Sequence, residues 1–121
     1  MSLSLIAVED CTIEDTLHKG TCTIKSGLSK KAKVANKKVL LDGCVITVSG
    51  GTVPGAQVSP VDITLNAQII TKLKFEGKCP IALNEVSSGT ETGDYQSGSS
   101  TVTQPIVLKI TKAGQDKVKG A

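Results

Sequence analysis

The chain has no tryptophan and no arginine, and it contains one phenylalanine, one tyrosine and one histidine among its 121 residues. Aromatic side chains supply the largest buried areas in protein cores. A core in this chain must therefore be built from Val, Ile, Leu, Ala and Cys. Such a core is thin, so we expect an oligomer, a docked module or a flat sheet architecture. The length suits a single domain, and we predict one β domain over residues 1–121.

The absence of arginine also bears on the partners. All 14 basic residues are lysines, against 11 acidic residues, which gives a formal net charge of +3. Arginine is the preferred side chain for bidentate recognition of phosphates and bases. Aromatic platforms on which bases stack are missing as well. We therefore predict that the chain has no nucleic-acid partner and that its lysines are solvated.

Long hydrophobic runs are a third absence. No apolar run approaches the ~18 residues of a membrane-spanning helix, so we predict no stable membrane insertion. The run 3–8 is too short for the core of a signal peptide and lacks a basic flank. We therefore expect synthesis in the cytoplasm without a Sec signal peptide. In that reducing compartment the four cysteines are expected to be thiols rather than disulfides.

What the sequence does contain is period-2 alternation, which is typical of half-buried strands. Over 61–75 nearly every apolar residue falls on one face. A single strand of that length would span about 50 Å, so a bend near 66–68 is expected. Shorter segments alternate in the same way around residues 21–25, 44–49 and 106–111. The segment 29–38 fits a strand at least as well as a helix. The fold class predicted is all-β.

Turn residues divide these segments, and two of the turns carry similar sequences. Asp42-Gly43 is interpreted as a tight hairpin turn. The hexapeptides 38–43 and 72–77 share the pattern Lys, aliphatic, any, large apolar, acid, Gly. We infer a pseudo-repeat around 32–49 and 66–83, in a small domain of repeated β-hairpins shaped as a cone or a compact sandwich or roll. Residues 87–101 are rich in Gly, Ser and Thr and are predicted to form a long, flexible, exposed loop.

Catalytic machinery is not evident in the sequence. His18 is the one histidine, and it lies just before a turn. The sequence contains no Gly-x-Ser-x-Gly motif that would supply a serine nucleophile. The carboxylate pairs Glu9-Asp10 and Glu14-Asp15 lack the aromatic sugar platforms that glycosidases use. We therefore predict that the chain is not an enzyme.

A metal site is one of two readings of the cysteines. Cys11, His18 and Cys22 lie within a dozen residues, while Cys44 and Cys79 follow the two similar turns. Zinc accepts Cys and His ligands in tetrahedral arrays. The spacing is nonstandard, however, and buried cysteines also act as small hydrophobic residues. Both readings remain open at this point.

The repeated turn carries a family resemblance. The segment Leu73-Lys74-Phe75-Glu76-Gly77-Lys78-Cys79-Pro80-Ile81-Ala82 is similar to the strand-turn-strand unit of PAAR-repeat and PAAR-like proteins. Val39-Leu40-Leu41-Asp42-Gly43-Cys44 resembles the same unit with its lysine replaced. The resemblance covers about 12 residues twice. The Pro-Ala-Ala-Arg tetrad itself is absent.

The resemblance implies a structural role. PAAR proteins sharpen the trimeric β-helical spike of contractile injection machines, such as type VI secretion systems and phage tails. The resemblance would place this chain at the tip of a virion tail or injection apparatus that is delivered outside the cell, with an effector as potential cargo. It also implies a zinc ion near the apex, with Cys11, His18, Cys22 and Cys79 as the ligand set.

A second hypothesis is a β-sandwich binding module, such as a phage decoration domain or an adhesin-like domain. The loop 87–101 would then recognise the ligand, because exposed loops on rigid scaffolds often carry binding residues. Tyr95 would be the anchor of that loop.

Overall fold

The computed structural model describes residues 3–51, 57–88 and 90–120, and this part of the chain is all-β, as predicted, with no helix. It therefore contains no helix that could cross a membrane. The strands are β1 (Ser4–Leu5), β2 (Thr12–Asp15), β3 (Thr21–Val34), β4 (Lys37–Ser49), β5 (Val61–Leu65), β6 (Thr92–Ser97), β7 (Ser100–Pro105), β8 (Leu108–Lys112) and β9 (Lys119–Gly120).

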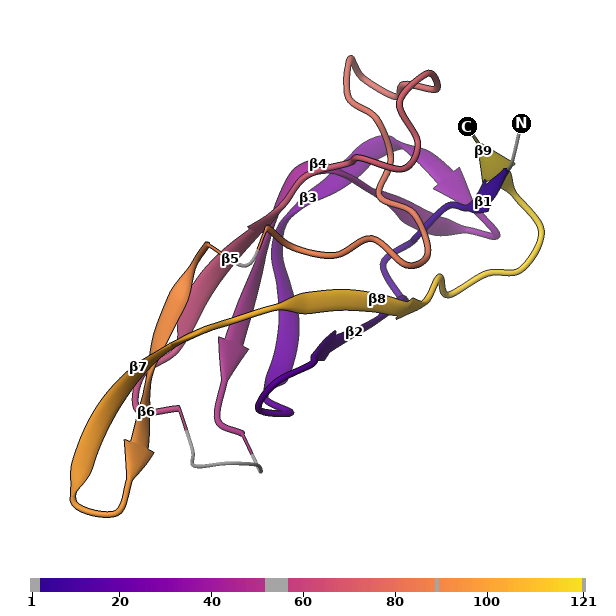
Figure 1. The fold of residues 1–121 in the computed structure, drawn as a ribbon. Coiled ribbons are helices and arrows are strands. Elements are labelled where there is room, and N and C mark those ends of the chain that lie inside the picture. Colours follow the sequence, from indigo (N-terminus) through magenta and orange to yellow (C-terminus); the bar gives the residue numbers. More distant parts are fainter. Residues whose placement is uncertain (1–2, 52–56, 89, 121) are drawn as a thin grey trace.

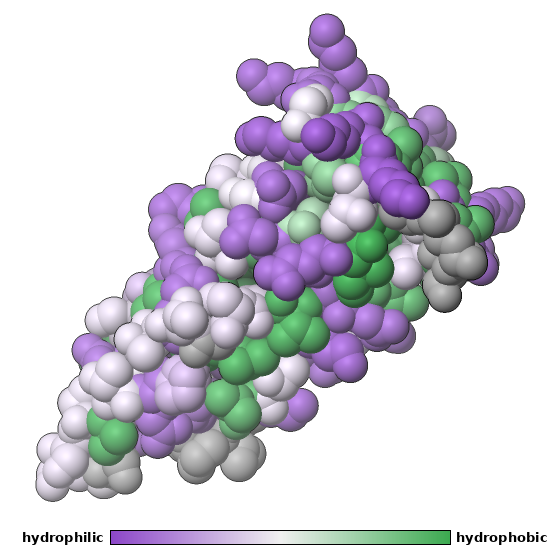
Figure 2. Space-filling model, turned by 45° about the horizontal axis from the view of Figure 1, so that its top comes forward, coloured by the Kyte–Doolittle hydropathy of each residue, from purple (hydrophilic) through white to green (hydrophobic). Residues whose placement is uncertain are grey.

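The strands form several small antiparallel sheets. The largest has the order β3-β4-β5, and the pairs β2-β8, β1-β9 and β6-β7 complete the set. The pair β2-β8 crosses the larger sheet, and β6-β7 extends from the opposite end to the two termini (Figure 1). The molecule is elongated and narrows toward the β6–β7 end (Figure 2).

The main core lies between the three-stranded sheet and the β2-β8 pair. The predicted alternation is confirmed here, because every second residue of β4 from Cys44 is fully buried, as are Leu108 and Ile110 of β8. The core is almost entirely aliphatic, with Tyr95 as its one aromatic member. Its buried members are Ala7, Leu40, Cys44, Ile46, Val48, Ile63, Leu65, Ile81, Tyr95, Ile106, Leu108 and Ile110.

A second, smaller cluster covers the opposite face of β4 near the termini. Val39 and Leu41 point into it, while Leu40 between them points into the main core. Both faces of β4 are thus buried over 39–41, because successive side chains of a strand point to opposite faces. Phe75 packs against the edge of this second cluster.

The interpretation of Asp42-Gly43 as a hairpin turn is wrong, because both residues lie inside β4. Gly43 has φ +80°, and the register between β3 and β4 shifts several times. The glycine therefore allows an irregular step in the pairing of the two strands. The actual β3–β4 turn is Ala35-Asn36, with φ +54° and +66°. Positive φ at both central residues matches the twist of a two-residue hairpin.

The segment 61–75 is also shorter as a strand than predicted. β5 ends at Leu65, close to the expected bend, and 66–74 runs outside the strands. Glu76-Gly77 does form a turn, closed by hydrogen bonds between Phe75 and Lys78. The first hexapeptide therefore lies within a long strand, whereas the second leads into an isolated turn. The two do not share a strand-turn-strand conformation.

The predicted loop 87–101 is wrong over most of its length. Thr92–Ser97 and Ser100–Pro105 form a regular antiparallel hairpin, β6–β7; residue 89 lies outside the described residues. The sequence hides this hairpin because its inward face carries Gly93 and Gln104 in addition to Tyr95 and Val102. A strand face with two apolar residues gives almost no period-2 signal.

Candidate functional site

The residues predicted to bind zinc are not brought together. Within the described part of the chain, no group of three His, Cys, Asp or Glu side chains could hold a metal ion. His18 is buried against the β6–β7 hairpin, and its Nε2 is already engaged by Gln104. Cys22 lies on β3, where its thiol faces the carbonyl oxygen of Gly20 at 3.9 Å.

The cysteine chemistry agrees with this placement. Burial raises the pKa of Cys11 and Cys22 from 9.0 to about 11, and that of Cys44 to about 12. The thiolate is the reactive form of cysteine, so burial makes these thiols less reactive toward electrophiles. The thiols pack as small apolar groups beside or within the main core. In the described part of the chain these thiols are thus not gathered into a group of three candidate ligands.

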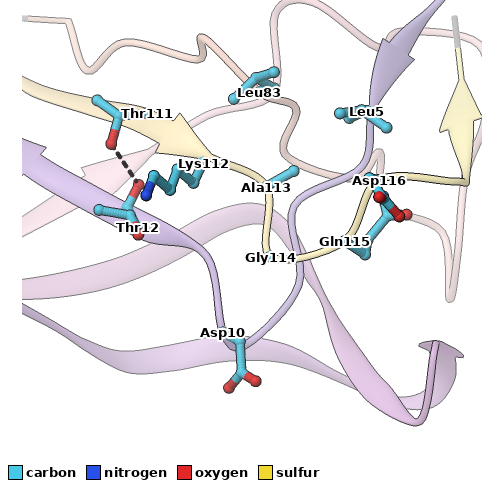
Figure 3. A pocket seen from close by; sticks show the side chains of 10 residues that line it. All are labelled: Leu5, Asp10, Thr12, Leu83, Thr111, Lys112, Ala113, Gly114, Gln115 and Asp116. Atoms are coloured by element: carbon cyan, nitrogen blue, oxygen red, sulfur yellow. Dashed lines mark hydrogen bonds between the residues drawn. The ribbon is translucent and has the colours of Figure 1, made fainter.

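A surface groove of about 600 Å³ lies where the loop after β8 meets the start of β2. It contains two carboxylates, those of Asp10 and Asp116, which point away from one another (Figure 3). Asp10 is paired with Lys37 at 2.7 Å. The groove therefore offers no converging acid–base pair at which a substrate could be held.

The β6–β7 hairpin forms a two-stranded sheet of its own. It projects from the narrow end, away from both termini (Figure 1). Its two-residue loop is Gly98-Ser99, with φ +63° at Gly98, which is the position where a type II′ turn requires glycine. Asp94 is the only charged residue between 92 and 105. Strongly hydrophilic side chains are concentrated at the other end of the molecule (Figure 2).

A stacked pair of rings anchors the hairpin to the body. Tyr95 stacks on His18 with ring centroids 3.7 Å apart and an interplanar angle of 19°. Nε2 of His18 lies 2.7 Å from Oε1 of Gln104. Because an amide oxygen only accepts hydrogen bonds, Nε2 must carry the proton. Burial, followed by the charges of Asp15 and Cys22, raises the pKa of Tyr95 to about 12.

The turn that carries His18 is shaped by the buried carboxylate of Asp15. This side chain accepts hydrogen bonds from the backbone N–H groups of Leu17, His18 and Gly20 at 3.2, 3.2 and 3.1 Å. An Asp side chain that bonds to the following backbone in this way fixes a tight turn. The turn therefore holds the imidazole where Tyr95 can stack on it.

Gln57 packs beneath β6, next to Gly93. A Cβ atom at Gly93 would lie 2.7 Å from Nε2 of Gln57 and 2.7 Å from Cδ1 of Ile106, so a larger residue there would displace these two side chains. The adjacent Val58 N–H donates to the carbonyl oxygen of Asp94 at 2.8 Å. The outer edge of β6 is thus covered by the chain around 57–58.

The outer edge of β7 is different. β7 pairs with β6 alone, and none of the backbone hydrogen bonds described for 90–120 reaches its other side. An unpaired strand edge is a template for pairing with another chain. This open edge, on a projecting and nearly uncharged hairpin, is the candidate site of the molecule.

Sequence reasoning placed Tyr95 in the recognition segment but assigned it the wrong role. Tyr95 is 2 % exposed, so it holds the hairpin in place and is not a surface anchor for a ligand. Gly93, Gln57 and Gln104 were missed. They carried no usable sequence signal, because a polar residue under a strand cannot be recognised without its partner.

No family model, no curated protein and no solved structure matches this chain.

Proposed function

We propose that this chain is a structural cap that completes the tip of a trimeric β-helical spike in a contractile injection machine, of the phage-tail or type VI secretion kind. The observation that carries the proposal is the projecting β6–β7 hairpin with one open, uncharged edge. The end of a β-helical spike exposes strand edges that must be covered to prevent aggregation. A hairpin with unpaired backbone groups can cover such an edge.

The distribution of charge supports the orientation. Five of the 14 lysines lie between Lys30 and Lys38, at the turn that joins β3 to β4. Charged side chains are costly to bury unless they are paired, and they are depleted at the centres of interfaces. We therefore orient the lysine-rich end into solvent and the hairpin end toward the spike.

The aliphatic body supports a mechanical role. Most of the strands are short, and the two long ones, β3 and β4, are joined by eight residue pairs along their length. The side chains inside are mostly small aliphatic groups, with a single aromatic ring in the main core. A tip that bears axial load needs dense backbone hydrogen bonding rather than deformable side-chain bulk.

The test is co-expression of this chain with the trimeric β-helical spike protein from the same source. We expect a complex of one cap per trimer, measured by light scattering after size exclusion. The control carries Lys31→Glu and Lys33→Glu at the far end and should bind equally well. A chain that remains a stable monomer beside the spike would overturn the proposal.

A second candidate function is a binding module of the decoration or adhesin type. The observation that favours it is the same projecting hairpin, whose outward face is lined by hydroxyl and amide side chains that can bind a polar ligand. Shortening the hairpin by removing residues 97–100 and rejoining 96 to 101 through a two-residue turn should abolish ligand binding and preserve the fold. An unchanged binding profile would exclude this function.

A further inference from the structure

The hydrogen-bonding direction of each β7 residue follows from the register. The two-residue loop closes on the pair Ser97–Ser100, and hydrogen-bonded and non-hydrogen-bonded pairs alternate from there. The even residues Val102 and Gln104 therefore direct their N–H and C=O groups toward β6. Ile106 continues this alternation, because its N–H donates to the carbonyl oxygen of Glu91 at 2.9 Å on the same side.

The odd residues consequently face outward. Thr101 and Thr103 each direct one N–H and one C=O away from β6, and Pro105 directs only a carbonyl because it has no N–H. Proline at this position ends the edge without leaving an unpaired donor. The available window runs from Ser100 to Gln104.

This window lacks most of the devices that proteins use to protect an edge. Charged residues, proline, bulges and short length are the usual protection, and only Pro105, at the end of β7, is of this kind. The stretch 100–105 contains no charge, its register with β6 is regular, and Thr101, Val102 and Thr103 are all exposed. Threonine and valine also favour the extended conformation. An edge left in this state is suited to receiving another strand.

We infer that the outer edge of β7 accepts an extended, uncharged strand of the partner protein, which pairs antiparallel to Ser100–Gln104. Antiparallel pairing is slightly more stable per residue than parallel pairing. The inference rests on the proposed function, because it identifies how the hairpin end docks on the spike.

The side chains define the partner strand further. Val102 is 39 % exposed and lies on the face of Tyr95, at a position that would form a non-hydrogen-bonded pair with the incoming strand. Side chains approach most closely in such pairs, so an apolar β-branched residue fits opposite Val102. A small hydroxyl residue fits opposite Thr101, because Thr–Thr pairs stabilise neighbouring strands. Opposite Thr103 such a residue must donate, because the Thr103 hydroxyl already donates to Oδ1 of Asp94 at 2.7 Å.

A second copy of this chain does not suffice as the occupant. Pairing β7 with itself about Val102 would join only two Ser100–Gln104 pairs, two Thr101–Thr103 pairs and one Val–Val contact. Stable interfaces bury about 1,200 Å² or more. An isolated ribbon of a few strands is also marginal in water. The edge of a large, preformed sheet offers the additional surface that two ribbons lack.

The experiment measures binding to the same spike trimer by biolayer interferometry. Thr101→Pro removes an outward N–H and places a ring at the edge, but it leaves the hydrogen bonds to β6 in place. We therefore expect the dissociation constant to rise at least about tenfold. Thr101→Ala keeps the N–H and should bind within about twofold of the wild type. Val102→Lys provides a second variant, since it places a charge in the pairing window without touching the backbone.

Amide exchange in the free protein provides an independent measurement. The N–H groups of Thr101 and Thr103 should exchange quickly and those of Val102 and Gln104 slowly, and spike binding should protect the first two. Equal binding by Thr101→Pro and wild type would overturn the inference while leaving the cap function intact. Absence of any complex would overturn both. A concentration-dependent dimer that Thr101→Pro abolishes would assign the edge to a second copy instead.

Discussion

The two hairpins of this molecule follow similar local rules and have opposite surroundings. β3–β4 closes on Ala35-Asn36 and β6–β7 on Gly98-Ser99, and both use two-residue loops with positive φ. The first is embedded, with β4 buried on both faces over 39–41. The second projects from the body and is held mainly by one aromatic ring.

The difference lies in where each hairpin obtains its stability. β3–β4 carries charged and irregular features, including a register that shifts three times, because packing against two clusters compensates for them. β6–β7 has a perfectly regular register but little apolar surface to bury. A two-stranded ribbon without a buried face is marginal by itself. We therefore expect the projecting hairpin to depend on its anchor and, in the complex, on its partner.

The largest expected effect is at the close contact inside the embedded hairpin. A Cβ at Gly27 would lie 2.3 Å from Cβ and 2.4 Å from Cα of Cys44, and φ there is +103°. Backbone cannot give way as a flexible side chain can, so overpacking and strain add. We expect Gly27→Ala to lower the free energy of unfolding by about 3–5 kcal/mol in urea denaturation.

Gly43→Ala is the matched control for that prediction. Gly43 also has positive φ, +80°, but a Cβ there would meet nothing within 4 Å. We expect a loss of about 1 kcal/mol from backbone strain alone. Equal losses at the two glycines would contradict the view that β3 and β4 approach each other most closely at Gly27.

The second effect separates the contribution of the Tyr95 ring to stability from that of its hydroxyl group. Tyr95→Ala removes the ring that joins the projecting hairpin to His18, and we expect a loss of about 3 kcal/mol. The hydroxyl of Tyr95 is buried without a hydrogen-bond partner. Burying an unpaired polar group is unfavourable, so Tyr95→Phe should be neutral or stabilise by up to about 1 kcal/mol.

Urea denaturation and amide exchange of the β6–β7 N–H groups would measure both changes. Tyr95→Ala should speed exchange in β6–β7 more than in β3–β4, because only the former depends on this ring. Uniform acceleration over both hairpins would show that they unfold as one unit. A loss of more than about 1 kcal/mol in Tyr95→Phe would mean that the hydroxyl is satisfied after all.

The third effect concerns a carboxylate that anchors the body. Glu85 is 2 % exposed, and its Oε2 accepts a hydrogen bond from the Gln68 N–H at 3.1 Å. Burial raises the pKa of Glu85 above its ordinary value of 4.5, with the hydrogen bond from Gln68 opposing. The folded state therefore binds this proton more tightly than the unfolded state does.

The sign of the pH dependence follows from that shift. The stabilisation linked to Glu85 is complete below the unfolded pKa and is lost as pH rises through the folded pKa. The difference in unfolding free energy between Glu85→Gln and wild type should therefore increase from about pH 4 to about pH 7. Urea denaturation across this range measures it. A constant difference would contradict the assigned shift.

The sequence was sufficient for the strands of the body and insufficient for the hairpin. Ile46, Val48 and Ile63 lie where period-2 alternation placed them, because one face of each strand meets the core. Gly43 was misread, because a positive-φ glycine can serve an irregular ladder as well as a turn. The open edge of β7 could not be predicted, because it depends on which strands the rest of the chain leaves unpaired.

The predicted zinc ligands are not grouped in the described residues, for a related reason. Cys11, His18 and Cys22 are near one another in sequence, but His18 turns toward Tyr95 and Gln104. Ligand types at nonstandard spacing do not define the direction in which each side chain points. Burial of a strand face determined the environment of Cys22 and Cys44 instead.

The smallest effect tests the charged end of the embedded hairpin. Lys33 and Lys38 are directly opposite each other in the β3–β4 register, and both are exposed. Like charges in such a pair are destabilising. We expect Lys38→Glu to raise the free energy of unfolding by about 0.5–1 kcal/mol at low salt and Lys38→Gln by about half as much. The gain should shrink at about 1 M salt, where the Debye length falls to about 3 Å.

The same variants bear on the comparison between the two ends. If the lysine-rich end is solvated in the assembled spike tip, Lys38→Glu changes stability and leaves spike binding unaltered. If binding instead weakens in Lys38→Glu while Thr101→Pro binds normally, the orientation is reversed and the embedded hairpin is the docking end. The charge at Lys38 and the backbone donor at Thr101 therefore form a matched pair of probes, one for each hairpin, and only one of them can report on the interface.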